Sequence, residues 1–433
     1  MSSLISEQRR VSTHRWRYPQ FMLLALIAAG AAAPLDARAS DALSFAKALD
    51  IAEAQAPQIE AQSAAVRAAA DEADRAPQLP DPQLIAGVEN LPVNGPDQFS
   101  LTRDFMTMRK VGVMQEFPRG DKRRLRGEVA DADVRKEEAE LAVRRLDVRR
   151  ETAMAWIERY VAERERSLLQ ELRAQAELTV AAAQASLKGG KGGSTSVIAA
   201  TADRVQLDDR IDAATRDVEQ ATATLARWIG VEAANAPLGA SPDFAVLASA
   251  PATLLRVGEH AALRPYDELE TRAEKGVALA RAEKSPDWSV EVDYAQRGPS
   301  YSNMMTIEFR VGLPLFAAHR QDPAIAAKVA QLDRVRAERD DALRMHHEET
   351  AKQLAAWTAA QKRLKRTEDE WLPLANERAE VALAEYRAGG DLQAVIAART
   401  SQIDARTAYV TQLGDLARSW AALNYLLPAK GQP

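Results

Sequence analysis

Cysteine is absent from this chain of 433 residues. That absence excludes disulfides, thiolate metal sites, cysteine nucleophiles and a lipid anchor attached through an N-terminal cysteine. Aromatic residues are also scarce, at 5% of the sequence, which suits coiled-coil packing better than a large globular core. Hydrophobic residues make up 46% and charged residues 27%, so the chain can bury a core and is not predicted to be disordered.

Long hydrophobic runs are lacking, and the most apolar one lies near the N-terminus. Four arginines precede the apolar run Phe21–Ala33, and Ala37-Arg38-Ala39 fits a small-x-small cleavage pattern. We interpret residues 1–39 as a cleavable signal peptide; the alternative is an uncleaved anchor. This segment carries five Arg, one Glu and one Asp, so its removal takes the formal charge from −5 to −8. An acidic mature chain argues against nucleic acid as a partner.

The stretch Asp121–Lys188 contains no proline and a single glycine, Gly127. Strong helix formers dominate it, and one helix of this length would span roughly 100 Å. Its apolar positions recur every seven residues, a period that keeps one seam facing partner helices only if the helices supercoil. Several seam positions are alanine, which lets neighbouring backbones approach closely. The pattern predicts a long helix in an extended helical assembly.

The sequence repeats itself about 200 residues apart. Val111-Gly112-Val113 returns as Val311-Gly312-Leu313, and Val197-Ile198-Ala199-Ala200 returns as Val395-Ile396-Ala397-Ala398. Each repeat is expected to contain an amphipathic helix, two short strands, a very long helix, a glycine turn and a returning helix. The amphipathic helices are expected at about Ser44–Arg75 and Leu254–Glu283.

The repeats are expected at 40–250 and 251–433. In the first, strands are predicted at about 82–90 and 108–117, the long helix at 121–188 and the returning helix at 194–229. In the second, strands are predicted at about 287–296 and 304–313, the long helix at 324–387 and the returning helix at 391–427. Pro373 should kink or restart that long helix, because it removes a backbone donor.

The four short segments alternate between apolar and polar residues, less regularly in the first repeat than in the second. In Met305–Leu313, for example, the odd-numbered positions are apolar and most of the even-numbered positions are polar. Such runs of about 9–11 residues match strands of a membrane barrel with a wet lumen, although one such strand could also belong to a soluble sheet. Four strands cannot close a barrel, which needs about eight. The chain is therefore expected to oligomerise.

The parts and their order resemble the TolC-like outer-membrane efflux family over about 41–430. The most specific local match is Val113–Leu125, which resembles the strand-to-helix junction of the heavy-metal branch, the CusC- and CzcC-type channels. Tyr386-Arg387-Ala388-Gly389-Gly390 resembles the Tyr-x-x-Gly tip of the family's helical hairpin. The resemblance implies a mainly α fold with a small membrane β-barrel. Three chains would form a 12-stranded barrel, four strands each, on a long α-helical periplasmic tunnel.

The resemblance also implies a passive exit duct of a tripartite efflux pump in the outer membrane. Its partners would be two further copies of the chain, a periplasmic adaptor (a membrane fusion protein), an inner-membrane RND-type transporter and outer-membrane lipid. No cofactor is implied. The adaptor would dock at the glycine turns of the hairpin tips, although these turns could instead serve only as helix caps; they comprise Gly189, Gly190, Gly192, Gly193, Gly389 and Gly390.

Some family members close the tunnel with aspartates just after the second hairpin. This chain has Val395 and Ala398 in that region, which puts an aspartate ring in doubt. The nearest acids are Asp391 and, in the first repeat, Asp203. We expect the constriction of the tunnel near these two residues.

The charged sides of the predicted strands supply the candidate lumen residues: Glu89, Glu116, Asp287, Glu291, Asp293, Glu308 and Arg310. A ring of carboxylates would favour cations through its local field. Together with the resemblance to the heavy-metal branch, this charge leads us to interpret the cargo as heavy-metal cations. The open alternatives are drug or organic-solute efflux through the same architecture, and a soluble periplasmic coiled-coil adaptor.

Other motifs allow more than one interpretation. The basic run Lys122-Arg123-Arg124 with Arg126 could meet lipid headgroups or pair with acids of a neighbouring subunit. Adjacent histidines such as His346-His347 point about 100° apart on a helix, so a solvated face is favoured over a metal site. Methionines near the strands fit apolar filling or lipid contact better than Cu(I) binding. No phosphate loop, nucleophile elbow or paired catalytic carboxylate is visible, so the sequence predicts a non-enzyme.

Overall fold

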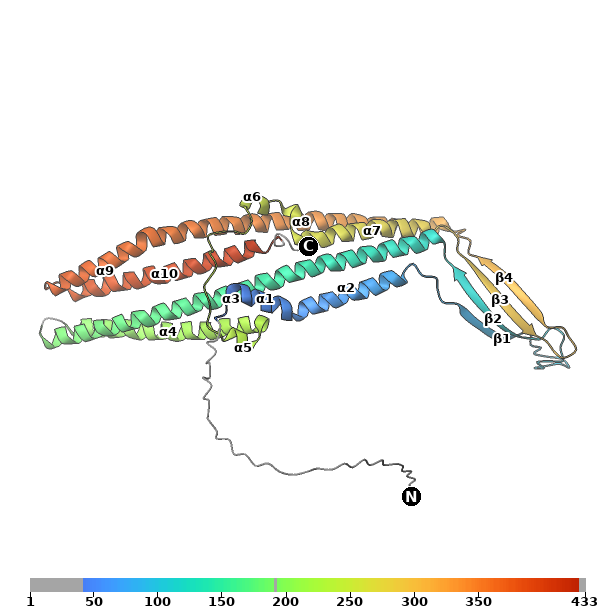
Figure 1. Ribbon diagram of the computed structural model, residues 1–433, viewed down its shortest axis with the longest axis horizontal. Helices are drawn as coiled ribbons and strands as arrows, with labels where there is room; N and C mark the ends of the chain where they lie inside the picture. The colour runs from blue at the N-terminus through green and yellow to red at the C-terminus, as the bar shows by residue number, and fades with distance from the viewer. Residues whose placement is uncertain (1–41, 191–192, 428–433) are drawn as a thin grey trace, which may run out of the picture. The chain divides into compact units, whose positions relative to one another are not determined.

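The computed structural model describes residues 42–190 and 193–427. The expected signal peptide, residues 1–39, and Gly192 of the first hairpin tip lie outside the described residues. The described chain is mainly helical, with one four-stranded antiparallel sheet, as the sequence predicts (Figure 1).

The long helices pack as neighbours in a fixed order. Helix α2 contacts α3, α3 contacts α7, and α7 contacts α8; beyond them α3 pairs with α4, and α10 packs against α3, α8 and α9. Figure 1 shows the sheet at one end of these helices and the turns of the α3/α4 and α9/α10 hairpins at the other. The helix bounds are α1 Phe45–Gln55, α2 Pro57–Arg75, α3 Gly120–Lys188, α4 Ser194–Ile229, α5 Val231–Ala234, α6 Pro251–Leu254, α7 Arg264–Ala282, α8 Gln321–Arg366, α9 Leu372–Arg387 and α10 Leu392–Asn424, with short 3₁₀ turns η1 Val257–Glu259, η2 Ala261–Leu263 and η3 Ala317–His319 and a π-helical turn η4 Thr367–Trp371.

The four strands follow one another across the sheet in chain order. They are β1 Gln83–Glu89, β2 Met108–Phe117, β3 Trp288–Gln296 and β4 Met304–Val311. Every neighbouring pair is antiparallel, although β2 and β3 are separated by the helices α3 to α7 and more than 160 residues of chain. Strands β1 and β4 are therefore the two edges of the sheet within this chain.

The helix α3 forms as the seven-residue repeat predicts. Seam residues Ala132, Ala153 and Ile157 are fully buried, and Tyr160 is half-buried. Arg119 precedes the helix in extended backbone, and Gly189 ends it. Because alanine occupies much of the seam, α4 and α7 can pack closely along its length.

The two predicted amphipathic helices are shorter or broken in the structure, so these predictions were wrong in extent. Ser44–Arg75 is interrupted at Ala56, which has ψ 115°, because the following Pro57 disfavours helical backbone in the residue before it. In the second predicted helix, Leu254–Glu283, the residues up to Leu263 form the end of a short helix and two 3₁₀ turns instead. A continuous helix begins only at Arg264, with Pro265 in its first turn.

Pro373 restarts the second long helix. The residues just before it, Thr367–Trp371, form a π-helical turn, and α9 begins at Leu372 with the proline in its first turn. The Oγ1 atom of Thr367 donates to Oε1 of Gln412 on α10, at 2.9 Å, and both residues are buried. A buried polar pair thus ties the interrupted helix to its neighbour.

The largest core lies midway along the helices and is built around Trp156. Its indole ring is fully buried, stacks on Tyr160 with centroids 5.3 Å apart and meets Phe45 edge-on at 5.3 Å. Two further indoles, those of Trp357 and Trp420, donate their N–H groups to backbone carbonyls in the connecting segment 244–246. These bonds fasten an irregular connection onto the helices.

Among the residues that the structure describes, none of the helices is both long and apolar enough to cross a membrane.

Candidate functional site

The sheet has one apolar and one charged face. Strand register places most of the apolar side chains of the four strands on the same face, and many of them are largely exposed; they include Leu84, Val88, Val111, Val113, Val292, Tyr294, Met305, Ile307, Phe309 and Val311. Leu84 is 76% exposed and Phe309 is 69% exposed. An exposed apolar face of this extent requires an apolar environment or a protein partner.

The opposite face gathers the charged residues that alternate with the apolar ones. Registers Met114↔Glu291, Lys110↔Ala295 and Glu291↔Glu308 place the predicted residues on it: Glu89, Glu116, Glu291, Asp293, Glu308 and Arg310. Lys110 also lies on this face, and sequence reasoning missed it. The sequence could have indicated this, because Lys110 has an even-numbered position in β2, like Gly112 and Glu116 of the same face.

The cations on this face bridge the acids. Lys110 Nζ lies 3.0 Å from Glu291 Oε1 and 3.3 Å from Asp293 Oδ2, and both carboxylates are at most 4% exposed. Arg310 pairs with Glu291 and donates from Nε to Glu308 at 2.7 Å. Gly112 is required in this arrangement, because a Cβ there would lie 2.3 Å from Asp293 Oδ1 and 2.7 Å from the Val292 carbonyl.

This pairing lowers the net charge of the face without reversing it. The two cations partly neutralise Glu291, Asp293 and Glu308, while Glu89 and Glu116 have no ion pair among the described residues. The face therefore stays acidic, less strongly than the sequence alone indicates. A mobile cation would interact most strongly with the carboxylates that have no ion pair, those of Glu89 and Glu116.

Replacing Lys110 with glutamine should raise the preference of the face for cations over anions, on the order of a few-fold, because it removes the counter-charge of Asp293 and one of the two counter-charges of Glu291. Reversal potentials of the reconstituted protein in a salt gradient measure this. Arg109→Gln is the matched control, since the register places Arg109 on the opposite side of the same strand. An unchanged reversal potential for Lys110→Gln would contradict the placement of this face along the ion path.

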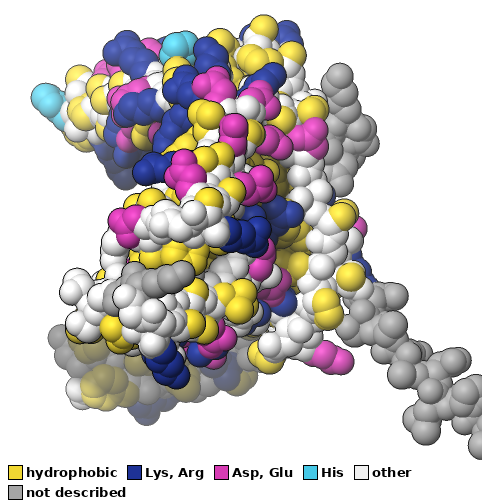
Figure 2. Space-filling view, turned by 90° about the vertical axis from the view of Figure 1, so that its left-hand side faces the viewer, with side chains coloured by type: hydrophobic (Ala, Val, Ile, Leu, Met, Phe, Trp, Pro, Cys, Tyr) yellow, Lys and Arg dark blue, Asp and Glu magenta, His cyan; other side chains and the backbone are white. Residues whose placement is uncertain are grey.

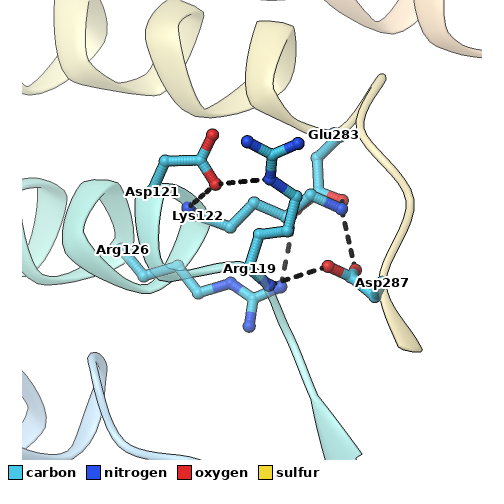
Figure 3. Close-up of polar contacts among 6 residues, drawn as sticks. All are labelled: Arg119, Asp121, Lys122, Arg126, Glu283 and Asp287. Atoms are coloured by element: carbon cyan, nitrogen blue, oxygen red, sulfur yellow. Dashed lines mark hydrogen bonds and ion pairs between the residues drawn. The ribbon is translucent and has the colours of Figure 1, made fainter. Parts of the chain in front are cut away.

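Asp287 lies at the junction between strands and helices, one residue before β3 (Figure 3). Its Oδ2 accepts from Lys122 Nζ at 2.7 Å, and its Oδ1 accepts from the backbone N–H of Arg119 at 3.0 Å. Lys122 is only 2% exposed and also lies 3.4 Å from Glu283, whose other oxygen is 3.5 Å from Arg126. The end of α7 and the start of β3 are thereby joined to the start of α3.

This geometry corrects the interpretation of the basic run. Lys122 pairs with Asp287 and Glu283, Arg124 pairs with Glu128, and Arg126 pairs with Glu283. All these acids belong to the same chain as the cations. Lys122 is too buried to reach lipid headgroups or another subunit. Sequence reasoning could not find the pairs of Lys122, because its partners are about 165 residues away in the chain.

The ion pair between Asp287 and Lys122 should make folding stability depend on pH. Burial raises the pKa of Asp287, but hydrogen bonds from Lys122 and from the Arg119 backbone N–H, with the charges of Lys122 and Arg126, hold this pKa below its ordinary value. A carboxyl whose pKa is depressed in the folded state stabilises fully above its unfolded pKa of about 3.9 and loses that contribution as the pH falls through its folded pKa.

Denaturant unfolding measured from pH 2 to pH 7, roughly two units below to three units above the unfolded carboxyl pKa, tests this pH dependence. The wild-type protein should lose more stability below about pH 4 than Asp287→Asn, which lacks the titrating group. Parallel pH profiles for the two proteins would contradict the assigned pairing.

The glycine turns close the two helical hairpins. Gly190 and Gly389 adopt φ angles of +69° and +103°, which strongly favour glycine, whereas Gly189 and Gly193 do not have positive φ. Gly390 has a different constraint, because a Cβ there would lie 2.8 Å from the Glu385 carbonyl oxygen. The hairpins touch, since Gln393 Nε2 donates to Ser196 Oγ at 3.0 Å. Seen from this end, basic, acidic and hydrophobic side chains are interspersed (Figure 2).

The two expected constriction residues have different surroundings. Asp391 is the N-cap of α10, where its Oδ1 accepts from the Gln393 backbone N–H at 2.9 Å. Asp203 lines a groove of about 110 Å³ between α3, α4 and α10, together with Arg210, Arg399 and Asp404. Asp404 was not identified from the sequence. A constriction at Asp203 and Asp391 stays a prediction.

The remaining candidate ligands are dispersed over the described residues. Glu348, beside His347, pairs with Lys352 at 2.5 Å on an exposed part of α8. Met305 is 71% exposed on the apolar face of the sheet, while Met114 and Met304 belong to the other face. Among the described residues, His, Cys, Asp and Glu form no group of three that could hold a metal.

Comparisons with known proteins give one partial family match and several solved structures with the same fold. The family model described as outer membrane efflux protein matches residues 48–231. The solved structure of the outer membrane protein VceC from Vibrio cholerae shares 18% identity, covers 88% of this chain and 95% of that chain, and has a TM-score of 0.73. The CmeC outer membrane channel of Campylobacter jejuni shares 14% identity over 90% of this chain and 87% of its own, with a TM-score of 0.74.

The structure of CusC gives similar values, with 13% identity, 88% and 92% coverage and a TM-score of 0.73. Because CusC matches no better than the others, the fold does not single out a heavy-metal branch. A search of curated protein sequences gave no significant match.

Proposed function

We propose that this chain, as a member of the TolC-like outer membrane efflux protein family, is the outer-membrane channel of a tripartite pump and the passive exit duct for heavy-metal cations. The family match and the shared fold support the channel. The acidic face of the sheet supports the cation cargo, and it is the observation on which that part of the proposal depends.

The sheet supports a barrel shared between three copies. Its apolar face is exposed, its edge strands β1 and β4 pair with no further strand among the described residues, and four strands are too few to close alone. Pairing β4 of one copy with β1 of the next would close twelve strands around a lumen. The apolar face would then meet lipid, and the charged face would meet water.

Aromatic side chains at both ends of the sheet support the same orientation. Phe117 and Trp288 stack with centroids 4.4 Å apart where the strands meet the helices, and Tyr294 lies near the opposite end. Tyr294 lies six positions after Trp288, a separation of about 20 Å along a strand. Aromatic residues at the two edges of an apolar band of about 25 Å are typical of membrane barrels.

The helical part would form the periplasmic tunnel, with the repeats 40–250 and 251–433 each contributing one long hairpin. The contact between the hairpins at Ser196 and Gln393 would hold their tips together. There the glycine turns would meet a periplasmic adaptor, which connects the channel to an inner-membrane RND-type transporter. The transporter would supply the energy, because a duct of this kind only conducts.

Growth of a deletion strain tests the cargo. Loss of the gene should sensitise cells to heavy-metal salts, and a plasmid carrying the wild-type gene should restore resistance. Sensitivity to antibiotics and dyes without metal sensitivity would overturn the metal assignment and support organic-solute efflux. A protein that salt alone releases from membranes would overturn the channel itself in favour of a soluble adaptor.

A further inference from the structure

A cavity of about 780 Å³ lies where the sheet meets the helices, over α7 and between α3 and α8. The helices α3, α7 and α8 border it, and α7 contacts both α3 and α8. Closing a barrel through the edge strands β1 and β4 therefore does not require another copy to fill it.

The floor of this groove is apolar and open. Leu279 of α7, Val335 of α8 and Leu313 line it, and Gly276 leaves space, since a Cβ there would meet nothing within 4 Å. Leu313 continues the apolar side of β4 past Val311, because the Gly312 N–H still donates to the Asp287 carbonyl at 3.0 Å and so extends the ladder. The groove thus adjoins the exposed apolar face of the sheet.

Two cationic side chains on its wall lack a carboxylate partner among the described residues. Arg320 forms no ion pair there, and Lys328 contacts only the Gln331 amide oxygen, at 3.1 Å. Arg320 immediately precedes α8 and Lys328 lies within it, about 12 Å farther along the helix axis. The acids of the groove are already matched, because Asp287 and Glu283 pair with Lys122 and Arg126. The groove therefore carries unmatched positive charge.

The segment between the sheet and α8 is also suited to a lipid surface. Leu315 is 77% exposed and Phe316 is 74% exposed, and both lie within five residues of Arg320. Exposed apolar side chains next to a cation are typical of the boundary between acyl chains and headgroups. The proposed orientation of the sheet places this segment at that boundary, on the side of the helices.

We propose that the groove binds one anionic phospholipid. Arg320 and Lys328 contact the phosphate of its headgroup, and an acyl chain lies along Leu313, Gly276 and Leu279. This site rests on the proposed membrane orientation. It would attach the junction of strands and helices to the lipid surface in a chain that has no cysteine for a covalent anchor.

Native mass spectrometry of the detergent-solubilised, full-length protein tests the site with phosphatidylglycerol as the probe. The wild-type protein should retain the lipid, and the double variant Arg320→Gln/Lys328→Gln should bind it at least about tenfold more weakly, because each lost cation removes a charge-assisted contact. The matched control is Arg344→Gln/Lys362→Gln, which removes one arginine and one lysine from exposed positions farther along α8 and should leave binding unchanged.

A second variant keeps the charges and fills the groove. Gly276→Leu should also weaken binding, by steric exclusion, while glycine removal from a helix interior favours folding. Equal affinity for phosphatidylethanolamine would overturn the anionic specificity. Absence of lipid from the wild-type protein, or equal binding by every variant, would overturn the site. The channel proposal would survive those results if disulfide cross-linking between β1 and β4 still gave a covalent trimer, so the two failures can be distinguished.

Discussion

Asp287→Ala should lower the free energy of unfolding by about 3–5 kcal/mol, because it leaves a buried ammonium without its closest counter-charge. Lys122 is 2% exposed, and its remaining acid, Glu283, lies farther away, at 3.4 Å. The Arg119 N–H also loses its acceptor. Denaturant unfolding of the detergent-solubilised protein, followed by circular dichroism, measures the change.

Replacing the other member of the pair, Lys122, should lower the free energy of unfolding by less. Lys122→Met removes the buried charge and keeps most of the side-chain volume, while Asp287 is left 25% exposed and still accepts from Arg119. The double variant Lys122→Met/Asp287→Ala should therefore recover part of the loss caused by Asp287→Ala alone. Additive losses in the double variant would contradict a direct interaction between the two residues.

Trp156→Ala should also lower the free energy of unfolding by about 3–5 kcal/mol, because it opens a cavity in the largest core. The ring has no exposed surface and contacts both Phe45 and Tyr160, which come from α1 and α3. Trp156→Phe should lose less, since it keeps an aromatic ring in the same space.

Trp371→Ala is the matched control for this core. Trp371 ends the π-helical turn and is 41% exposed, so its loss should change stability by less than about 1 kcal/mol. If the two alanine variants unfolded at the same denaturant concentration, the aromatic cluster around Trp156 would not be the main source of stability in this region.

Much of the fold could be predicted from the sequence because it follows from periodicity. The seven-residue repeat predicts the long helix α3, and alternation, strict in the second repeat and less regular in the first, predicts the four strands and their charged face. Breaks in helices were harder to place. The interruption at Ala56 depends on the residue after it, Pro57, which the apolar pattern of α1 and α2 does not show.

The pairs of the site could not be predicted, because they depend on contacts across the chain. Lys110 neutralises two acids only because β2 lies beside β3 in one particular register. Lys122 likewise meets Asp287 only when the start of α3 and the end of α7 come together. Periodicity gives the side of an element on which a residue lies, but it does not identify the residue opposite.

Disulfide cross-linking tests the central claim, the barrel shared by three copies. Because the chain has no cysteine, each pair introduced into the edge strands can be assigned without background. Suitable outward positions are Leu84 or Val88 in β1, combined with Ile307 or Phe309 in β4. Single-cysteine variants serve as controls, and a disulfide forms only where the Cα atoms approach to about 4.4–6.8 Å.

At least one pair should give a covalent trimer in outer membranes on a non-reducing denaturing gel, and reduction should return it to the monomer. If all pairs stayed monomeric while the protein remained in the membrane fraction, the two edge strands would not meet in a neighbouring copy. The shared barrel would then be wrong.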